Sequence, residues 1–215
     1  WGTCKIYHDI NKVREAASEM LKDKERFKDC PNYQHDIADV VRQTLTDSTY
    51  YLIKDIAASY EKKDMVAFKA QYTTFLGILS DLNRLLSQVG LFKLEKWTNS
   101  ARNICDEVPG TTEADRDWME WNARTLVTVW GPEQCAEQGR LHDYSSRQWG
   151  GMLNDFYLAR WEMFFKALEE GKTITSTEWF KWEENWTRSK TITKVAEENA
   201  VDVASELYDK YFSKQ

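Results

Sequence analysis

The spacing of apolar residues after Asp64 constrains the fold more than any other feature of this sequence. Large apolar side chains recur at alternating steps of four and three residues: Phe68, Tyr72, Phe75, Leu79, Leu82 and Leu86. This spacing places them on one face of an α-helix, and that face needs an apolar partner. The preceding stretch, about 33–61, has apolar residues at steps of four and seven, and a short joint at 61–64 separates the two stretches. We therefore predict a long antiparallel helix pair.

The remaining segments also show helical periodicity, and none alternates with period two for long. A first helix is predicted to begin near Asp9, and others at about 92–106, 112–129, 141–170 and 198–213. Capping boxes at Thr112–Asp115 and Thr175–Glu178 mark two helix starts, and a Trp-rich helix follows the second. Nine glycines and three prolines leave little material for tight turns. We predict an all-α bundle of about eight helices with long antiparallel pairs, forming a single domain over residues 1–215.

Charge and hydropathy argue against several classes of partner. The net charge of -6 is scattered, without a basic stripe, which disfavours a surface for nucleic acid or an anionic membrane. No apolar run reaches the roughly 18 residues of a membrane-spanning helix, and no signal-peptide pattern is present. The sequence begins at Trp1 instead of Met, so we expect a piece of a longer polypeptide.

The cysteines, histidines and glycines match no known metal or cofactor motif. The four cysteines are too widely spaced for a CxxC motif: Cys4, Cys30, Cys105 and Cys135. A Cys4–Cys30 disulfide and free thiols are both open. The three histidines fall in no HxxxH pattern: His8, His35 and His142. Gly150–Gly151 lies inside a predicted helix, where close helix packing explains it better than phosphate binding. We predict no metal and no cofactor.

Two of the 35 carboxylates stand out because they lie among aromatic residues: Asp143 and Asp155. One interpretation is a buried hydrogen-bonding or ion-pair role for each, for instance with Arg147 or Arg160. The other is the carboxylate pair of a self-contained glycosidase, in which the distance between the two groups decides the stereochemical outcome. Sequence spacing does not give that distance, and we prefer the ion-pair interpretation.

Three residues around one predicted loop are candidates for a sugar contact. Trp130 precedes the helix-stopping pair Gly131–Pro132, and Tyr144 lies three residues after Leu141, in the first turn of the next predicted helix. An indole, an aliphatic chain and a phenol would then surround the loop. Sugar rings stack their C–H faces on such aromatic rings, and a phenol can also bond a hydroxyl group. Core packing at a helix–loop–helix joint is an equal alternative from these residues alone.

A block of short motifs carries a family resemblance. Residues 129–133 read VWGPE, 141–144 read LHDY, 148–151 read QWGG and 155–161 read DFYLARW. This order resembles the alpha-N-acetylglucosaminidases of glycoside hydrolase family 89, and a weaker similarity continues upstream at 33–45. The resemblance covers most of this chain but only about the last third of a family member.

The resemblance implies an all-α C-terminal domain that follows a small α/β domain and a (β/α)8 catalytic barrel. Family members remove terminal α-linked N-acetylglucosamine (GlcNAc) with retention, using two glutamates of the barrel. No catalytic residue is therefore carried over to this chain. The resemblance implies instead that Trp130, Leu141 and Tyr144 bind substrate at the pocket edge. The alignment at Leu141 is the weakest, because the loop 134–140 is longer here. Arg160 matches an arginine that we interpret as structural, paired with a helix or barrel carboxylate.

We therefore expect the C-terminal domain of an exo-acting, retaining alpha-N-acetylglucosaminidase that forms one wall of the substrate pocket and is inactive alone. Its expected partners are a glycan with terminal GlcNAc and the (β/α)8 domain of the same polypeptide. The resemblance also implies secretion to the periplasm or cell surface, and a lysosomal location in animal relatives. Trp149 and Ala159 depart from the family pattern. The alternative is a non-catalytic, aromatic-rich helical module that binds carbohydrate or a protein partner.

Overall fold

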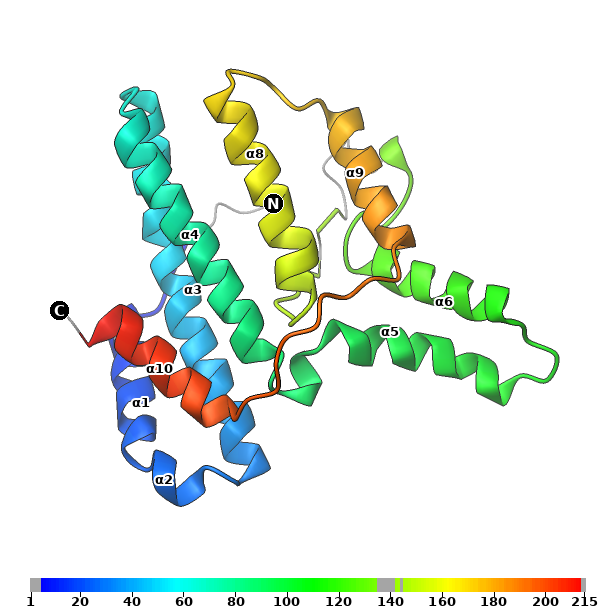
Figure 1. Cartoon of the computed structure of the whole chain (residues 1–215), viewed down its shortest axis with the longest axis horizontal. Helices are drawn as coiled ribbons and strands as arrows, with labels where there is room; N and C mark the ends of the chain where they lie inside the picture. The colour runs from blue at the N-terminus through cyan, green and yellow to red at the C-terminus, as the bar shows by residue number, and fades with distance from the viewer. Residues whose placement is uncertain (1–4, 135–141, 144, 214–215) are drawn as a thin grey trace. The chain divides into compact units, whose positions relative to one another are not determined.

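The computed structural model describes residues 5–134, 142–143 and 145–213. These residues form α-helices, short 3₁₀ turns and one π-helical stretch, with an isolated β-bridge in place of strands. The all-α prediction is confirmed. The chain divides into two compact units, one formed by Trp1–Val89 with Val195–Gln215 and the other by Gly90–Lys194 (Figure 1). That residues 1–215 act as a single domain stays a prediction.

The first unit contains α1 (Ile10–Lys22), α2 (Lys24–Phe27), α3 (Pro31–Glu61), α4 (Met65–Leu86) and α10 (Ala200–Phe212). Asp9 and Asp64 cap α1 and α4, because each carboxylate accepts a hydrogen bond from a backbone N–H of the first turn. Helices α3 and α4 lie side by side and antiparallel, and α10 packs against both (Figure 1). The predicted helix pair is confirmed.

The predicted apolar face of α4 forms much of this unit's core. Five of its six residues are buried: Phe68, Phe75, Leu79, Leu82 and Leu86. The facing helices add buried aliphatic side chains, among them Ile37, Val41, Leu45, Val203 and Leu207. Arg84 of α4 bonds Glu198, just before α10, and Glu206 within α10. The core of the first unit is therefore closed by a helix from the end of the chain.

The second unit begins with a 3₁₀ turn (Gly90–Phe92) and continues with α5 (Leu94–Asn103), a second 3₁₀ turn (Ile104–Glu107) and α6 (Glu113–Leu126). A π-helical stretch (Leu153–Leu158) runs directly into α8 (Ala159–Glu169), and α9 (Ser176–Arg188) follows. Both predicted capping boxes are present, at the starts of α6 and α9. Helix α6 packs against α5 and α9. The core comprises Leu94, Val127, Met152, Phe156 and Trp186.

The predicted helix over 141–170 is wrong at its start. Residues 142–143 and 145–151 are not helical, and the helix begins at Met152. Gly151 has a φ of +89°, and a Cβ atom there would lie 2.8 Å from Cγ2 of Ile192. The backbone of Gly150 bonds Phe92 and Leu94, forming the isolated bridge with residue 93. The glycine pair therefore precedes the helix, and Gly151 allows close approach to Ile192 of a loop and to Leu94 at the start of α5.

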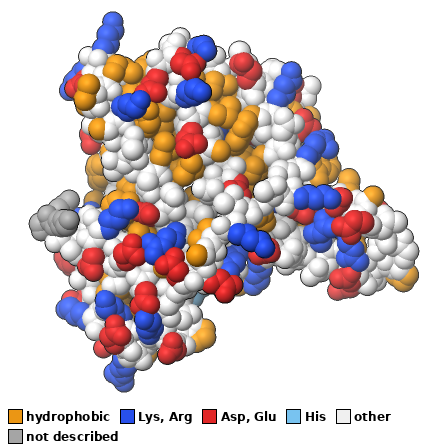
Figure 2. All heavy atoms as spheres, in the orientation of Figure 1, with side chains coloured by type: hydrophobic (Ala, Val, Ile, Leu, Met, Phe, Trp, Pro, Cys, Tyr) orange, Lys and Arg blue, Asp and Glu red, His pale blue; other side chains and the backbone are white. Residues whose placement is uncertain are grey.

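Charges of both signs are mixed on one face of the molecule (Figure 2). Lys and Arg side chains lie among Asp and Glu over the face shown in Figure 2, without a stripe of one sign. None of the helices within the described ranges is long and apolar enough to cross a membrane.

Candidate functional site

The segment after α6 brings Trp130 beyond the end of the helix. Helix α6 ends at Leu126, before the predicted stop at Gly131–Pro132. Trp130 has a φ of +64° and donates its backbone N–H to the carbonyl of Thr125 at 2.9 Å. Its side chain is 37% exposed. Leu141 and Tyr144 lie outside the described residues, so the meeting of the three predicted residues stays a prediction.

The described part of the following loop is tied to the end of α6. The N–H of Asp143 bonds the carbonyl of Thr128 at 2.8 Å, and the hydroxyl of Ser145 bonds the carbonyl of Val127 at 3.3 Å. Asp143 itself has a φ of +55°, a conformation that Asp adopts more readily than most residues. Both residues next to Tyr144 are therefore hydrogen-bonded to the segment that ends α6, Asp143 through its backbone and Ser145 through its side chain.

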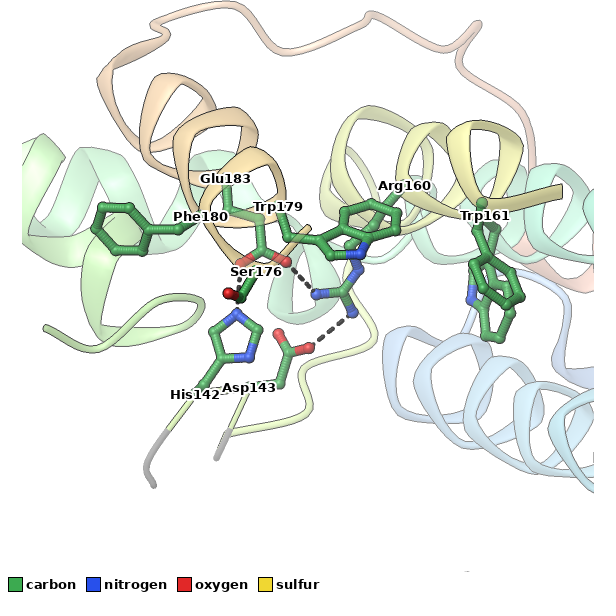
Figure 3. Close-up of a pocket in the computed structure, with 9 residues that line it drawn as sticks. His142, Asp143, Arg160, Trp161, Ser176, Trp179, Phe180 and Glu183 are labelled. Atoms are coloured by element: carbon green, nitrogen blue, oxygen red, sulfur yellow. Dashed lines mark hydrogen bonds and ion pairs between the residues drawn. The ribbon is translucent and has the colours of Figure 1, made fainter. Parts of the chain in front are cut away.

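A four-residue charge network joins this loop to α8 and α9 (Figure 3). The guanidinium of Arg160, from α8, bonds Asp143 of the loop at 2.7 Å and Glu183 of α9 at 2.6 Å. The second oxygen of Glu183 bonds Nε2 of His142. Glu183 is 1% exposed. A buried carboxylate without partners is energetically unfavourable, so a movement of the loop that broke these bonds would be costly. The bonds therefore hold the loop against the two helices.

The network shifts the pKa of two of its members. Burial lowers the pKa of Arg160, but the charges of Asp143 and Glu183 outweigh burial and the net shift is upward. The hydrogen bond to Glu183 raises the pKa of His142 against the opposing effect of burial. The carboxylates thus favour the cationic form of each group that they contact.

A cavity of about 380 Å³ opens beside the network. The loop and α8 supply His142, Asp143, Arg160, Trp161 and Phe164, and α9 supplies Ser176, Trp179, Phe180 and Glu183. Figure 3 shows Arg160 between Glu183 and Asp143, with the Trp179 ring alongside. One oxygen of Asp143 is buried without a hydrogen-bond partner among the described residues. Aromatic walls with a few polar groups, at this volume, suit a small polar ligand such as a sugar.

Comparison with known proteins shows which family this chain belongs to. The sequence model of the alpha-N-acetylglucosaminidase (NAGLU) C-terminal domain matches residues 3–210. The chain belongs to this family. The human alpha-N-acetylglucosaminidase is 26% identical over 164 residues, which cover 76% of this chain and 21% of the human protein.

Solved structures give the same result for the fold. A family 89 glycoside hydrolase from Clostridium perfringens in complex with PUGNAc has a TM-score of 0.87 and 30% identity, covering all of this chain and 25% of that chain. The C. perfringens enzyme in complex with its substrate GlcNAc-α-1,4-galactose has a TM-score of 0.84 and 31% identity, over 95% of this chain and 24% of that chain. This chain thus spans about a quarter of the length of these relatives.

The predicted ion pair of Asp143 with Arg160 is confirmed. Asp155 has different partners: it accepts hydrogen bonds from the N–H of Thr193 at 2.7 Å and from the side chain of Asn154 at 2.9 Å. Arg147 lies over the Trp149 ring. The structural interpretation of Arg160 is also confirmed, because one of its partners, Glu183, is a helix carboxylate. Asp143 thus has an arginine partner, whereas Asp155 is held by hydrogen bonds to uncharged groups.

Sequence reasoning missed Glu183 and gave His142 no role. A signal for Glu183 was present, since it stands four residues after Trp179 and three before Trp186, on the apolar face of α9. A carboxylate at such a position must be buried and therefore needs a cationic partner. His142 had no comparable signal, because its partner lies 41 residues away.

No group of three or more His, Cys, Asp and Glu side chains within the described ranges could hold a metal ion. Cys30 is an exposed free thiol and Cys105 a buried one, while Cys4 and Cys135 lie outside the described residues.

Proposed function

We propose that this chain is the C-terminal part of an exo-acting, retaining alpha-N-acetylglucosaminidase, and that it forms one wall of the pocket for a terminal α-linked GlcNAc. The observation that carries the proposal is the family match over residues 3–210, which includes the whole loop between α6 and α8. The C. perfringens relative bound to GlcNAc-α-1,4-galactose supports this choice of substrate class.

Each predicted site residue has a physical role in this proposal. Trp130 stacks on a C–H face of the sugar, Tyr144 bonds a ring hydroxyl, and Leu141 adds an aliphatic wall. Two observations support this arrangement: Trp130 is partly exposed beyond the end of α6, and both neighbours of Tyr144 are hydrogen-bonded to that helix end. A pocket with walls on all sides admits only a terminal residue, which accounts for exo specificity.

The carboxylates that cleave the glycosidic bond belong to another part of the polypeptide in this proposal. A retaining glycosidase needs two carboxyl groups about 5 Å apart, one as nucleophile and one as acid and base. The cavity carboxylates of this chain, Asp143 and Glu183, are both bonded to Arg160 and are thereby committed to structure. We therefore assign the reacting carboxylates to a (β/α)8 domain of the same, longer polypeptide, and we place the whole enzyme outside the cytoplasm.

Hydrolysis of an aryl α-N-acetylglucosaminide tests the proposal. The chain alone should show no turnover, and the longer polypeptide that contains it should release the aryl alcohol. In that longer protein, Tyr144→Phe should lower kcat/KM by about tenfold, because one hydrogen bond to a hydroxyl is lost. Tyr51→Phe, at an exposed position of α3, is the control. Turnover by the chain alone would contradict the proposal, and Asp143 and Asp155 would then be the residues to mutate.

The aromatic cavity leaves room for a second function, a non-catalytic module that binds carbohydrate or a protein partner. The observation that favours it is that the cavity forms from residues of this chain alone. A longer polypeptide that binds GlcNAc without hydrolysing the aryl glycoside would support this function over the first.

A further inference from the structure

A second cavity, of about 510 Å³, lies in the same unit between α6 and the end of α9. It shares no lining residue with the cavity beside Arg160. Its lining consists of Asp117, Trp118, Glu120 and Trp121 from α6, with Thr187, Arg188, Ser189 and Lys190 from the end of α9 and beyond. We call this cavity the α6–α9 groove. Its composition, two indoles among polar and charged groups, is the feature to explain.

The indole of Trp118 is exposed to an unusual degree. It is 58% exposed, although Trp118 and Trp121 lie one turn apart on the same helix face. The two ring centroids are 6.3 Å apart, and the planes are tilted by 51°. The guanidinium of Arg188 lies 5.2 Å from the Trp121 ring centroid and occupies a face of that ring. Trp118 is therefore the indole that offers an open face to a ligand.

Another exposed tryptophan of this unit, Trp97, has a clear structural role, whereas Trp118 does not. Trp97 is 38% exposed, but its indole N–H bonds the carbonyl of Ala123 at 2.9 Å and its ring packs on Trp149. Trp118 contributes its ring to a groove instead. An exposed indole ring beside hydrogen-bonding groups is an arrangement that suits a ligand with both an apolar face and hydroxyl groups.

The polar groups around Trp118 are paired and oriented. Lys190 bonds Asp117 at 2.5 Å, and Asp117 also accepts from Arg102 at 2.8 Å. Arg188 bonds Glu184 at 3.0 Å. Each cation of the groove thus already has a carboxylate partner, which leaves little net positive charge for a sulfate or phosphate. The same groups keep further N–H donors and carboxylate lone pairs for hydroxyl groups.

We propose that the α6–α9 groove binds a neutral glycan, with a pyranose ring stacked on Trp118 and its hydroxyls bonded to Asp117, Arg188 and Lys190. Such a site would hold a branch or an inner part of a glycan. The proposal stands on the groove alone and does not depend on catalysis by the longer polypeptide.

Site-resolved binding by the whole chain tests the proposal. The chain is labelled with 5-fluorotryptophan, and ¹⁹F NMR follows titration with GlcNAc and with GlcNAc-α-1,4-galactose. The Trp118 signal is assigned from Trp118→Phe. The signals of Trp118 and Trp121 should shift together with a millimolar Kd. Trp118→Ala should weaken binding by about tenfold, and Trp118→Phe, which keeps a stacking face, should weaken it less. Trp130→Ala is the matched control and should leave the shift at Trp118 intact.

Three results would overturn the proposal. The first is a shift confined to other indoles, such as Trp130 or Trp179, and the second is no shift with either sugar. The third is tighter binding of a heparin hexasaccharide that persists in Trp118→Ala, since that would indicate a charged ligand held by other residues. Because the readout is binding and not turnover, failure of the hydrolysis assay and failure of this experiment are distinguishable.

Discussion

Glu183 is a buried carboxylate whose two oxygens hold cations from two different segments. One oxygen bonds Arg160 of α8 and the other bonds His142 of the loop. A buried ion pair of this kind adds little stability compared with well-packed apolar side chains, but removal of one partner leaves the others uncompensated. The role of Glu183 is therefore to position the loop next to Tyr144.

Glu183→Gln should destabilise the second unit by roughly 3 kcal/mol, because Arg160 and His142 lose the charge that offsets their burial. Chemical denaturation followed by tryptophan fluorescence would measure this change. Glu184→Gln, the neighbouring residue paired on the surface with Arg188, is the control and should change stability by less than about 1 kcal/mol. Equal effects of the two substitutions would show that Glu183 does not hold the network.

His142 should make stability depend on pH. Its pKa is raised in the folded state, chiefly by the hydrogen bond to Glu183. Its contribution is therefore fully present below the unfolded value of about 6.5 and is lost as the pH rises through the higher folded value. The Tm advantage of the unsubstituted chain over His142→Asn should be larger at about pH 6 than at about pH 8. In a Glu183→Gln background this difference should vanish, and a difference that survives there would contradict the assignment.

At the scale of single elements, Gly151 shows how one residue sets the start of a helix. Its positive φ turns the chain from the bridge at Gly150 into the π-helical stretch, and its missing Cβ leaves room for Ile192. The π-helical stretch then directs Asp155 to the backbone N–H of Thr193. A short segment thus fixes the link between α9 and the end of this unit.

Gly151→Ala should destabilise the chain by about 2 kcal/mol or more, because it combines an unfavourable φ with a Cβ 2.8 Å from Ile192. Gly171→Ala is the matched control, since Gly171 also has a positive φ but no atom within 4 Å of a built Cβ. It should cost only about 1 kcal/mol. The difference in unfolding free energy between the two variants gives the cost of the contact between the added Cβ and Ile192. Equal unfolding free energies would show that this contact costs nothing.

Elements with local signals were predictable from the sequence. The seam of α4, the caps at Asp9 and Asp64 and both capping boxes each lie within a few residues of the structure that they specify. The start of the helix at Met152 was not predictable, because the apolar periodicity runs back through 141–151 and only contacts with Leu94 and Ile192 override it. In the site, Arg160 was one of two arginines expected to pair with Asp143 or Asp155, whereas His142 and Glu183 meet only through the tertiary fold.

At the scale of the whole molecule, the first unit is discontinuous in sequence. Its core needs α3 and α4 from the start of the chain and α10 from the end, with Leu207 and Val203 fully or almost fully buried. The second unit is the insertion between these two parts. The charged bonds of Arg84 to Glu198 and Glu206 lie at the edge of this closing contact.

Removal of residues 200–215 should therefore loosen the first unit. We expect faster hydrogen exchange in the parts of α3 and α4 that α10 covers, because several buried aliphatic side chains lose their partners. Lys210→Gln keeps the helix and removes only a surface pair with Asp81, and it should leave exchange in α3 and α4 nearly unchanged. Retained protection in the truncated chain would show that α3 and α4 form a sufficient core.

Because the first unit is discontinuous, its core cannot be completed until α10 has been synthesised. A ribosome adds roughly 5–20 residues per second, so about a hundred residues separate the emergence of α4 from that of α10 by roughly 5–20 s. During that interval the apolar side chains of the nascent α3–α4 hairpin that α10 later covers are exposed to the cytosol or to the translocation machinery. We therefore expect the first unit to depend on a chaperone more than the second, and a chain that stops after residue 194 to be degraded by proteases.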